Sequence, residues 1–207
     1  MHANDPRAAE VLNFWFAEHD RKAWFAKDPA FDAEIGRRFL SLHAEAAAGQ
    51  LAEWKRSPYD CLALVLALDQ FPRNLFRHSA RAFASDAAAI DAARHAIDSG
   101  HDEVLRPVER QFLYLPFEHS ESLDEQWRAL ALISRLAPWP ETADAFSWAV
   151  RHWEIIRRFG RFPHRNAVLG RKNTAAEIDF LKQPGSSFQS AGHRALARGR
   201  DELHVLR

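Results

Sequence analysis

Residues 58–70 read PYDCLALVLALDQ, and this stretch decides the fold. A proline directly after Ser57 is typical of a helix start, because serine caps the first turn and proline fits within it. From Cys61 to Leu68 the stretch is apolar all round rather than on one face. A helix of this kind is stable only when other elements cover it. The sequence therefore predicts a central helix over residues 58–70.

Helical signals continue on both sides of this stretch, and no segment has the alternating polarity and hairpin turns of a strand ladder. Start signals, apolar faces and glycine or proline stops predict further helices at residues 6–18, 29–48, 86–99, 107–116, 123–136, 142–159 and 175–183. The prediction is an all-α fold of about eight helices in stacked antiparallel pairs. We expect one domain over residues 1–189 and a flexible tail over residues 190–207.

The overall charge argues against a polyanionic partner. The 207 residues contain 28 basic and 28 acidic side chains, so no global field attracts nucleic acid or an anionic membrane. The longest apolar run is too short to span a bilayer, and the single cysteine, Cys61, cannot form a disulfide within the chain. We therefore expect a cytoplasmic protein that binds neither nucleic acid nor membrane.

A short motif occurs twice, as QFPRN at residues 70–74 and, with one residue inserted, as RFPHRN at residues 161–166. Each copy follows an apolar helical run and combines an aromatic residue, a helix-stopping proline and several donor groups. Two such corners indicate one polar site built from both. The residues expected to bind a ligand there are Arg73, Asn74, Arg77, His164, Arg165 and Asn166.

Asp69 is the acid that most invites a functional interpretation. It shares a helical face with Leu62, Val65 and Leu66 in the last turn of the predicted central helix. A carboxylate at that place is desolvated and opposed by the negative end of the helix dipole, so it requires a cationic partner. The candidates are Arg73, Arg110 and Arg165. Either a buried ion pair that fixes the corner or a catalytic acid is consistent with this pattern.

Two histidines are further catalytic candidates. His119 follows Pro116 and extends an apolar face, which places it at a buried position or a cavity wall. Because Glu118 and Glu121 flank it, one of these carboxylates can set its tautomer, and the histidine can then act as a general base. The alternative is a helix C-terminus with surface acids. His152 lies on an apolar stripe with Trp148, where a hydrogen-bonded core histidine is the commoner arrangement. The catalytic candidates are thus Asp69, Glu118, His119 and His152, and whether the protein is an enzyme stays open.

We expect no metal and no cofactor, because the chain has none of the common signatures. It has no His-Glu-x-x-His, no paired cysteines, no phosphate loop and no dinucleotide fingerprint. His119, His152 and His164 with Glu118 are the combination that spacing alone leaves open.

Several motifs together resemble the bacterial family known as domain of unknown function 924. They are LDQFPRN (68–74), RAFASD (81–86), FLYLPFEHSE (112–121), RFGRFPHRN (158–166), VLNFWF (11–16) and FLKQPGSSF (180–188). The resemblance covers nearly all of residues 5–188. It implies an all-α domain of the tetratricopeptide-like superhelical class, and it implies no activity.

Three functions remain after these observations. The first is a groove that binds an anionic group of a peptide or small metabolite through the arginines and histidine of the corners. The second is a metal-independent enzyme that uses a histidine and a carboxylate in the same pocket as an acid–base pair. The third is a structural role in which the corners are internal ion-pair networks. If both corners and His119 meet in one concavity, the first two are favoured.

Overall fold

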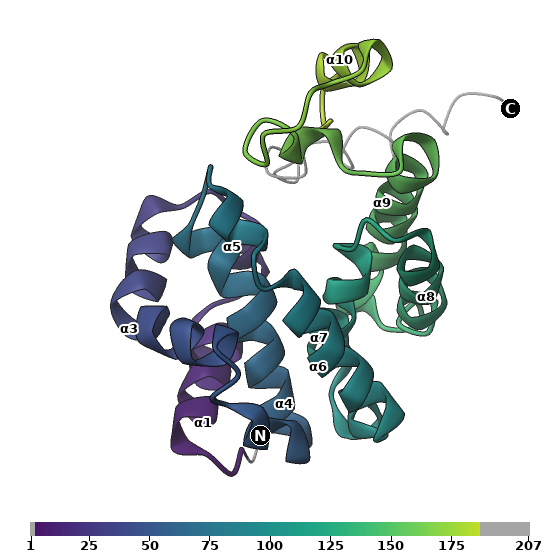
Figure 1. Ribbon diagram of the computed structural model, residues 1–207. Coiled ribbons are helices and arrows are strands. Elements are labelled where there is room, and N and C mark those ends of the chain that lie inside the picture. The colour runs from purple at the N-terminus through teal and green to yellow at the C-terminus, as the bar shows by residue number, and fades with distance from the viewer. Residues whose placement is uncertain (1–2, 187–207) are drawn as a thin grey trace, which may run out of the picture.

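The structure is a computed structural model that describes residues 3–186, and throughout this part of the chain it contains helices and no strands (Figure 1). The α-helices are α1 (Pro6–Asn13), α2 (Arg21–Trp24), α3 (Pro29–Ala47), α4 (Pro58–Val65), α5 (Phe71–Leu75), α6 (Asp86–Asp98), α7 (Pro107–Glu118), α8 (Leu123–Ser134), α9 (Ala145–Phe159) and α10 (Ala175–Leu181). Short 3₁₀ turns occur at Ala52–Arg56, Ala80–Phe83, His101–Val104, Pro140–Thr142 and Pro163–Arg165. The all-α prediction is confirmed.

The helices begin and end as the local sequence dictates. The Asp28 side chain accepts hydrogen bonds from the first amides of α3, and Ser57 caps α4 in the same way. Gly49 and Gly100 adopt left-handed backbone angles just after α3 and α6, where a side chain would be strained. Ser122 precedes α8 without a side-chain capping hydrogen bond, and the carboxylate of Glu125 in the first turn pairs with Arg94 of α6.

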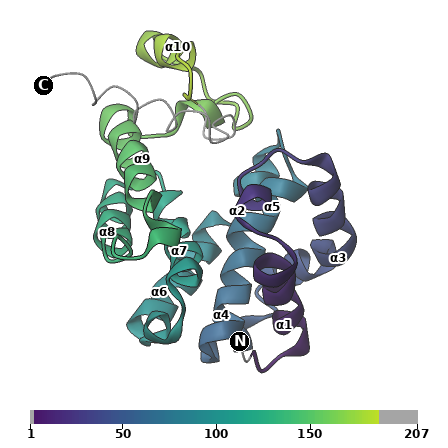
Figure 2. The same cartoon turned by 180° about the vertical axis from the view of Figure 1, so that it is seen from behind.

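Helix α4 is central, as its composition predicts. Every residue from Asp60 to Val65 is buried, and the helix packs against α1, α6 and α7. Seen from the front and from behind, α4 lies between α1 on one side and α6 and α7 on the other (Figures 1 and 2). The main apolar core is one cluster that draws on α1, α3, α4, α6, α7, α8 and α9. No helix within residues 3–186 is long and apolar enough to cross a membrane.

The expected helix stop at Pro72 is wrong. Helix α4 continues into a π-helical turn, η3 (Leu66–Gln70), and then into α5, which contains Pro72 in its first turn. The Phe71 amide donates to the Leu66 carbonyl five residues back, so the helix is already π-helical in the turn before Pro72. Proline is tolerated there because the first turn of a helix needs no amide donor from it. A second π-helical turn, η1 (Phe14–Glu18), extends α1.

Pro116 likewise fails to end its helix, since α7 runs on to Glu118. The chain then folds back through α8 and α9, which pack against each other and against α7. Helix α9 ends at Gly160, whose φ of +68° reverses the chain into the second corner. That corner and α10 lie beyond the end of α9 (Figure 1). Packed helix pairs are therefore present, whereas the tetratricopeptide-like superhelix and the extent of the single domain stay predictions. The predicted tail lies outside the described residues.

Candidate functional site

The first corner places Arg73 against two residues of the following segment. Its Nη2 lies 2.8 Å from Oδ1 of Asp86, at the start of α6. Its guanidinium carbon lies 4.7 Å from the ring centroid of Phe83, and Nη1 donates to the Ala82 carbonyl. The guanidinium is thus held in place by a carboxylate, an aromatic face and a backbone oxygen.

The second corner brings Arg165 to the same two residues. Its Nη1 lies 3.6 Å from Oδ2 of Asp86, and its guanidinium carbon lies 4.6 Å from the centroid of Phe83 and 4.4 Å from that of Phe162. The residue is only 6% exposed, and its Nε has no hydrogen-bond partner among the described residues. Burial and the nearby charge of Arg73 lower the pKa of Arg165 to about 10, so it remains a cation at neutral pH. The two corners meet at Phe83 and Asp86.

A salt bridge fixes the second corner to the end of α7. Glu121 accepts two hydrogen bonds from Arg171, at 2.6 and 2.9 Å, and a third at 2.8 Å from the Phe162 amide. Although burial raises the pKa of Glu121, these donors outweigh it and leave that pKa below its ordinary value. The ionised Glu121 therefore holds the loop that carries Arg165.

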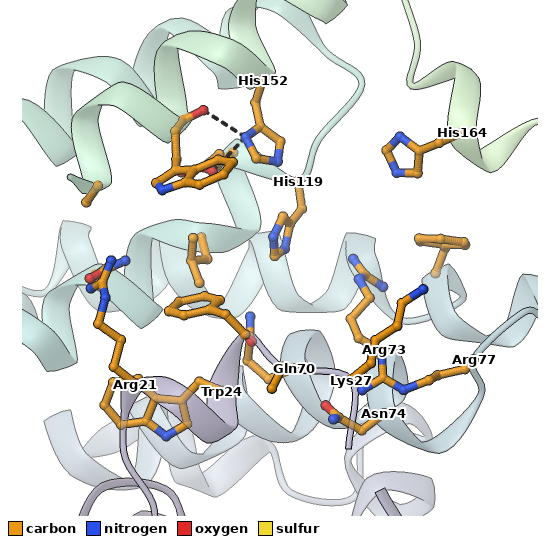
Figure 3. A pocket seen from close by; sticks show the side chains of 18 of the residues that line it. Arg21, Trp24, Lys27, Gln70, Arg73, Asn74, Arg77, His119, His152 and His164 are labelled. Carbon is orange, nitrogen blue, oxygen red and sulfur yellow. Dashed lines mark hydrogen bonds and ion pairs between the residues drawn. The ribbon is translucent and has the colours of Figure 1, made fainter. Parts of the chain in front are cut away.

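Both corners open into one pocket of about 200 Å³. It lies between the N-terminal helices, which supply Arg21 to Arg77, and the segments from α7 onward, which supply the histidines (Figure 3). The lining residues are Arg21, Trp24, Phe25, Ala26, Lys27, Gln70, Arg73, Asn74, Arg77, Phe83, Gln111, Leu115, Glu118, His119, Ala145, Trp148, His152, His164 and Arg165. Five of these are arginine or lysine and one is acidic, so the wall itself is rich in cations. Carboxylates outside the lining pair with four of them: Asp144 with Arg21, Asp32 with Arg77, and Asp86 with Arg73 and Arg165.

The pocket has two chemically different ends. Arg73, Asn74, Arg77, Lys27 and His164 gather at one end in the close-up view, and we call this the cationic end (Figure 3).

Trp24 lies at the other end beside Arg21, whose charge is matched by Asp144 (Figure 3). Phe25 is adjacent, since the Arg21 guanidinium lies 5.5 Å from its ring centroid. We call this the apolar end. The imidazole of His119 lies between the two ends (Figure 3).

Asp69 and His119 form a hydrogen-bonded pair at the floor of the pocket. Nδ1 of His119 lies 2.8 Å from Oδ1 of Asp69, and because a carboxylate only accepts, Nδ1 carries the hydrogen. Asp69 is 0% exposed and also accepts from Gln70 at 2.6 Å, with Arg73 Nη2 3.6 Å away. Burial raises the pKa of Asp69, but the His119 charge, these hydrogen bonds and Arg73 outweigh it, and the pKa lies below its ordinary value.

His152 and Glu118 form a second pair of the same kind. Nδ1 of His152 lies 2.8 Å from Oε1 of Glu118 and 2.9 Å from the Trp148 carbonyl, and both of these atoms are acceptors. Nδ1 therefore carries a hydrogen here too. The ring centroids of His119 and His152 are 6.2 Å apart. The expectation that Glu118 or Glu121 orients His119 is wrong, because these acids bind His152 and Arg171 while Asp69 orients His119.

His164 is a neutral member of the cationic end. Burial, the adjacent Arg165 and the other histidines lower its pKa from 6.5 to about 3. A neutral imidazole next to two guanidiniums avoids adding a further positive charge to a buried cluster. It offers one donor and one acceptor nitrogen rather than a cation.

The remaining predicted residues have specific partners. Arg77 and Asn74 both donate to Asp32 of α3, Asn74 at 2.8 Å, while they line the pocket. Asn166 is fully buried, donates to Asn173 at 2.6 Å and does not line the pocket. Arg110 donates to the Leu105 and Glu103 carbonyls and is not a partner of Asp69.

The histidines of the pocket do not converge with Glu118 on one ligating point. Among residues 3–186, ligand atoms that could share an ion come together at Glu18, His19 and Glu34. Arg38 already forms ion pairs with both of those glutamates.

Sequence reasoning missed the residues that complete the pocket. Phe83 and Asp86 join the two corners, and Trp24, Phe25 and Lys27 form walls. Asp86 starts a helix, and that role alone accounts for an aspartate at this place in the sequence. The RAFASD motif lies between the two corners in the sequence, which is a further sign that Asp86 belongs to the site. Sequence spacing, however, does not show that Asp86 contacts both Arg73 and Arg165 in the fold.

Comparison with known proteins places this chain in a family. Residues 11–185 match the family described as bacterial protein of unknown function (DUF924), and the chain belongs to it. The solved structure of a protein of unknown function, ATU0120 from Agrobacterium tumefaciens, is similar, with a TM-score of 0.80 and 40% identity. The match covers 84% of this chain and 96% of that one. Comparison with curated proteins gives no significant match.

Proposed function

We propose that the pocket binds a small molecule, or the end of a peptide, that has an anionic group and an apolar body. The observation that carries this proposal is the meeting of Arg73 and Arg165 at one end of an aromatic-lined cavity. Convergence of both corners with His119 is the arrangement expected of a binding or catalytic pocket. A purely structural role for the corners predicts either that they lie apart or that their polar groups satisfy one another completely. The corners meet, and the Nε of Arg165 has no hydrogen-bond partner among the described residues.

The cationic end supplies the recognition of charge. Guanidinium groups form paired hydrogen bonds with carboxylate and phosphate oxygens, and the aromatic faces of Phe83 and Phe162 keep the Arg165 fork in one orientation. The Nε of Arg165 lacks a partner among the described residues, so a ligand oxygen would satisfy a donor that burial otherwise penalises. Asp86 is the carboxylate that the ligand anion would have to compete with.

The apolar end supplies the recognition of the body. Trp24 and Phe25 contribute aromatic surface, and Leu115, Ala145 and Trp148 add apolar wall. Transfer of an aromatic or aliphatic group from water to such a surface is favourable, at about 25 cal/mol per Å². A volume of about 200 Å³ limits the ligand to a small metabolite or a single terminal residue.

Phenylphosphonate and phenylacetate test this proposal, since each joins an aromatic ring to a phosphonate or a carboxylate. The wild type should show a rise in Tm that increases with ligand concentration. Arg165→Met should weaken binding at least tenfold by isothermal titration calorimetry. Arg157→Met is the matched control, because Arg157 is exposed on α9, where its guanidinium lies 5.2 Å from the Trp153 ring centroid, and does not line the pocket. If neither compound stabilises the wild type, the proposal is wrong.

An enzyme is the second candidate, and the observation that favours it is the pair of histidine–carboxylate contacts. A histidine whose Nδ1 is fixed by a carboxylate presents Nε2 for proton transfer. Two such pairs line one pocket here, at His119 and His152.

A further inference from the structure

The position of His119 between the two ends of the pocket determines which bond of a ligand lies next to it. A ligand with its anion at Arg73 and Arg165 and its body near Trp24 extends from one end to the other (Figure 3). The bond that joins the anion to the body then falls in the middle. His119 is the titratable side chain labelled there, and its Nδ1 is already fixed on Asp69.

The cationic end fits a phosphate monoester better than a single carboxylate. A phosphate monoester presents three terminal oxygens and close to two negative charges at neutral pH. Arg73, Arg77 and Lys27 line this end, and Arg165 joins Arg73 at Phe83. Asp32 pairs with Arg77, and Asp86 is shared by Arg73 and Arg165, so a ligand must compete with these carboxylates. Three phosphoryl oxygens do so better than the two of a carboxylate. In such an ester the middle bond is the P–O bond to an apolar alcohol or phenol.

We propose that the pocket hydrolyses small phosphate monoesters of apolar alcohols or phenols, with His119 as the general acid that protonates the ester oxygen. This proposal rests on the proposed binding function. Asp69 is a positioning residue, because it touches His119 and not the substrate. Its carboxylate fixes Nδ1–H and stabilises the imidazolium, so that Nε2–H is directed away from the floor of the pocket.

The reaction balances with water as the other reactant. The P–O bond to the alcohol breaks, the electron pair goes to the ester oxygen, and this oxygen takes the Nε2 proton of His119. A water oxygen forms the new bond to phosphorus on the side opposite the ester oxygen and loses one proton to solvent, and Nε2 regains a proton from solvent. The products are the alcohol and inorganic phosphate, and His119 regains its starting form. Arg73 and Arg165 stabilise the charge on the phosphoryl oxygens as the bond breaks.

The asymmetry of the two pairs supports the choice of His119. Asp69 is shared by His119, Gln70 and, at 3.6 Å, Arg73, so the imidazole is tied to the arginine that faces the phosphate. Nδ1 of His152 instead contacts Glu118 and the carbonyl of Trp148, one helical turn earlier on α9.

Leaving-group dependence tests the proposal in a way that a structural role cannot imitate. The probes are phenyl phosphate and p-nitrophenyl phosphate, because phenolate needs protonation as it leaves and p-nitrophenolate needs it far less. The wild type should release phosphate from both. His119→Gln should lower the rate of phenyl phosphate hydrolysis about a hundredfold to ten-thousandfold, and that of p-nitrophenyl phosphate hydrolysis much less. His95→Gln, on the exposed face of α6, is the matched control and should behave as the wild type.

Asp69→Asn should reproduce part of this pattern, with the larger loss again for phenyl phosphate and kcat affected more than KM. Phenylphosphonate, which cannot be hydrolysed at its C–P bond, reports binding separately in all variants. Binding of phenylphosphonate without release of phosphate from either ester overturns the catalytic proposal and leaves the binding function standing. An equal loss on both esters in His119→Gln also overturns the general-acid role. If the wild type binds neither phenylphosphonate nor phenylacetate, both the binding proposal and the catalytic proposal are overturned.

Discussion

Arg73 and Arg165, which come from the two separate corners, lie over the same ring, with guanidinium carbons 4.7 and 4.6 Å from the centroid of Phe83. Both also contact the carboxylate of Asp86. Like charges brought this close repel each other unless an anion lies between them. Asp86 provides that anion in the free protein, and a bound ligand would add a second one.

Asp86→Asn should therefore tighten the binding of phenylphosphonate. The amide removes a carboxylate that competes for both guanidiniums, and we expect Kd to fall several-fold by calorimetry. The pKa of Asp86 lies above its ordinary value, because burial and the charge of Asp69 raise it by more than Arg73 and Arg165 lower it. The variant should also be less stable, because two arginines lose their shared counter-ion. A weaker Kd would show instead that Asp86 is needed to hold the arginines in place.

Gly160→Ala should destabilise the protein by about 1–2 kcal/mol, measured by urea unfolding, because a φ of +68° is unfavourable for any residue with a Cβ. No atom lies within 4 Å of the added Cβ, so the cost comes from the backbone alone. Gly36→Ala is the control. Gly36 lies inside α3 with Leu75 at 3.9 Å, an ordinary contact, and alanine should be neutral or stabilising by about 0.5–1 kcal/mol. Equal effects at both positions would contradict this account.

Glu121→Gln should cost about 1–2 kcal/mol, because it removes the charge from a bidentate contact with Arg171 and from the Phe162 amide. It should also weaken phenylphosphonate binding, since the same loop carries Arg165. Glu53→Gln provides the comparison. Glu53 pairs with Arg56 on the surface, where both side chains are more than two thirds exposed, and the change should stay within about 0.5 kcal/mol.

The half-buried His164 should make the protein less stable as the pH falls. Its pKa is lowered from 6.5 to about 3 in the folded protein, while the unfolded chain takes up a proton near the ordinary value. Protons therefore bind the unfolded state first as the pH drops below 6.5, and the loss continues until about pH 3. Urea unfolding of the wild type and His164→Gln at pH 7 and pH 4.5 measures this. The wild type should lose more stability than the variant between these values, and a parallel decline would contradict the shift.

Composition, together with the residues that start and stop helices, was sufficient to predict the helical fold and the central position of α4. The apolar run at residues 61–68 requires cover on all sides, and Asp28, Ser57, Gly49 and Gly100 act locally, so their effects can be read without knowing the rest of the fold. The repeat of the corner motif also indicated that Arg73 and Arg165 belong together.

The partners inside the pocket could not be predicted in the same way. The two acids and two histidines on η3, α9 and the end of α7 allow more than one pairing. Only the packing of these elements selects Asp69 for His119 and Glu118 for His152. The expected helix stop at Pro72 failed for a related reason. In the π-helical turn before the proline, hydrogen bonds span five residues instead of four. Side chains after this turn therefore lie on a different face of the helix from the one that a 3.6-residue period predicts.

The widened turn at Leu66–Gln70 has an evolutionary consequence. A π-helical turn accommodates one residue more than the α-helical turn it replaces, and this one presents Asp69 and Gln70. Loss of a single codon there would return the segment to a regular helix and swing the carboxylate by about 100°, away from its histidine. An ancestor without that codon would be a regular helical scaffold in which Asp69 and His119 do not pair.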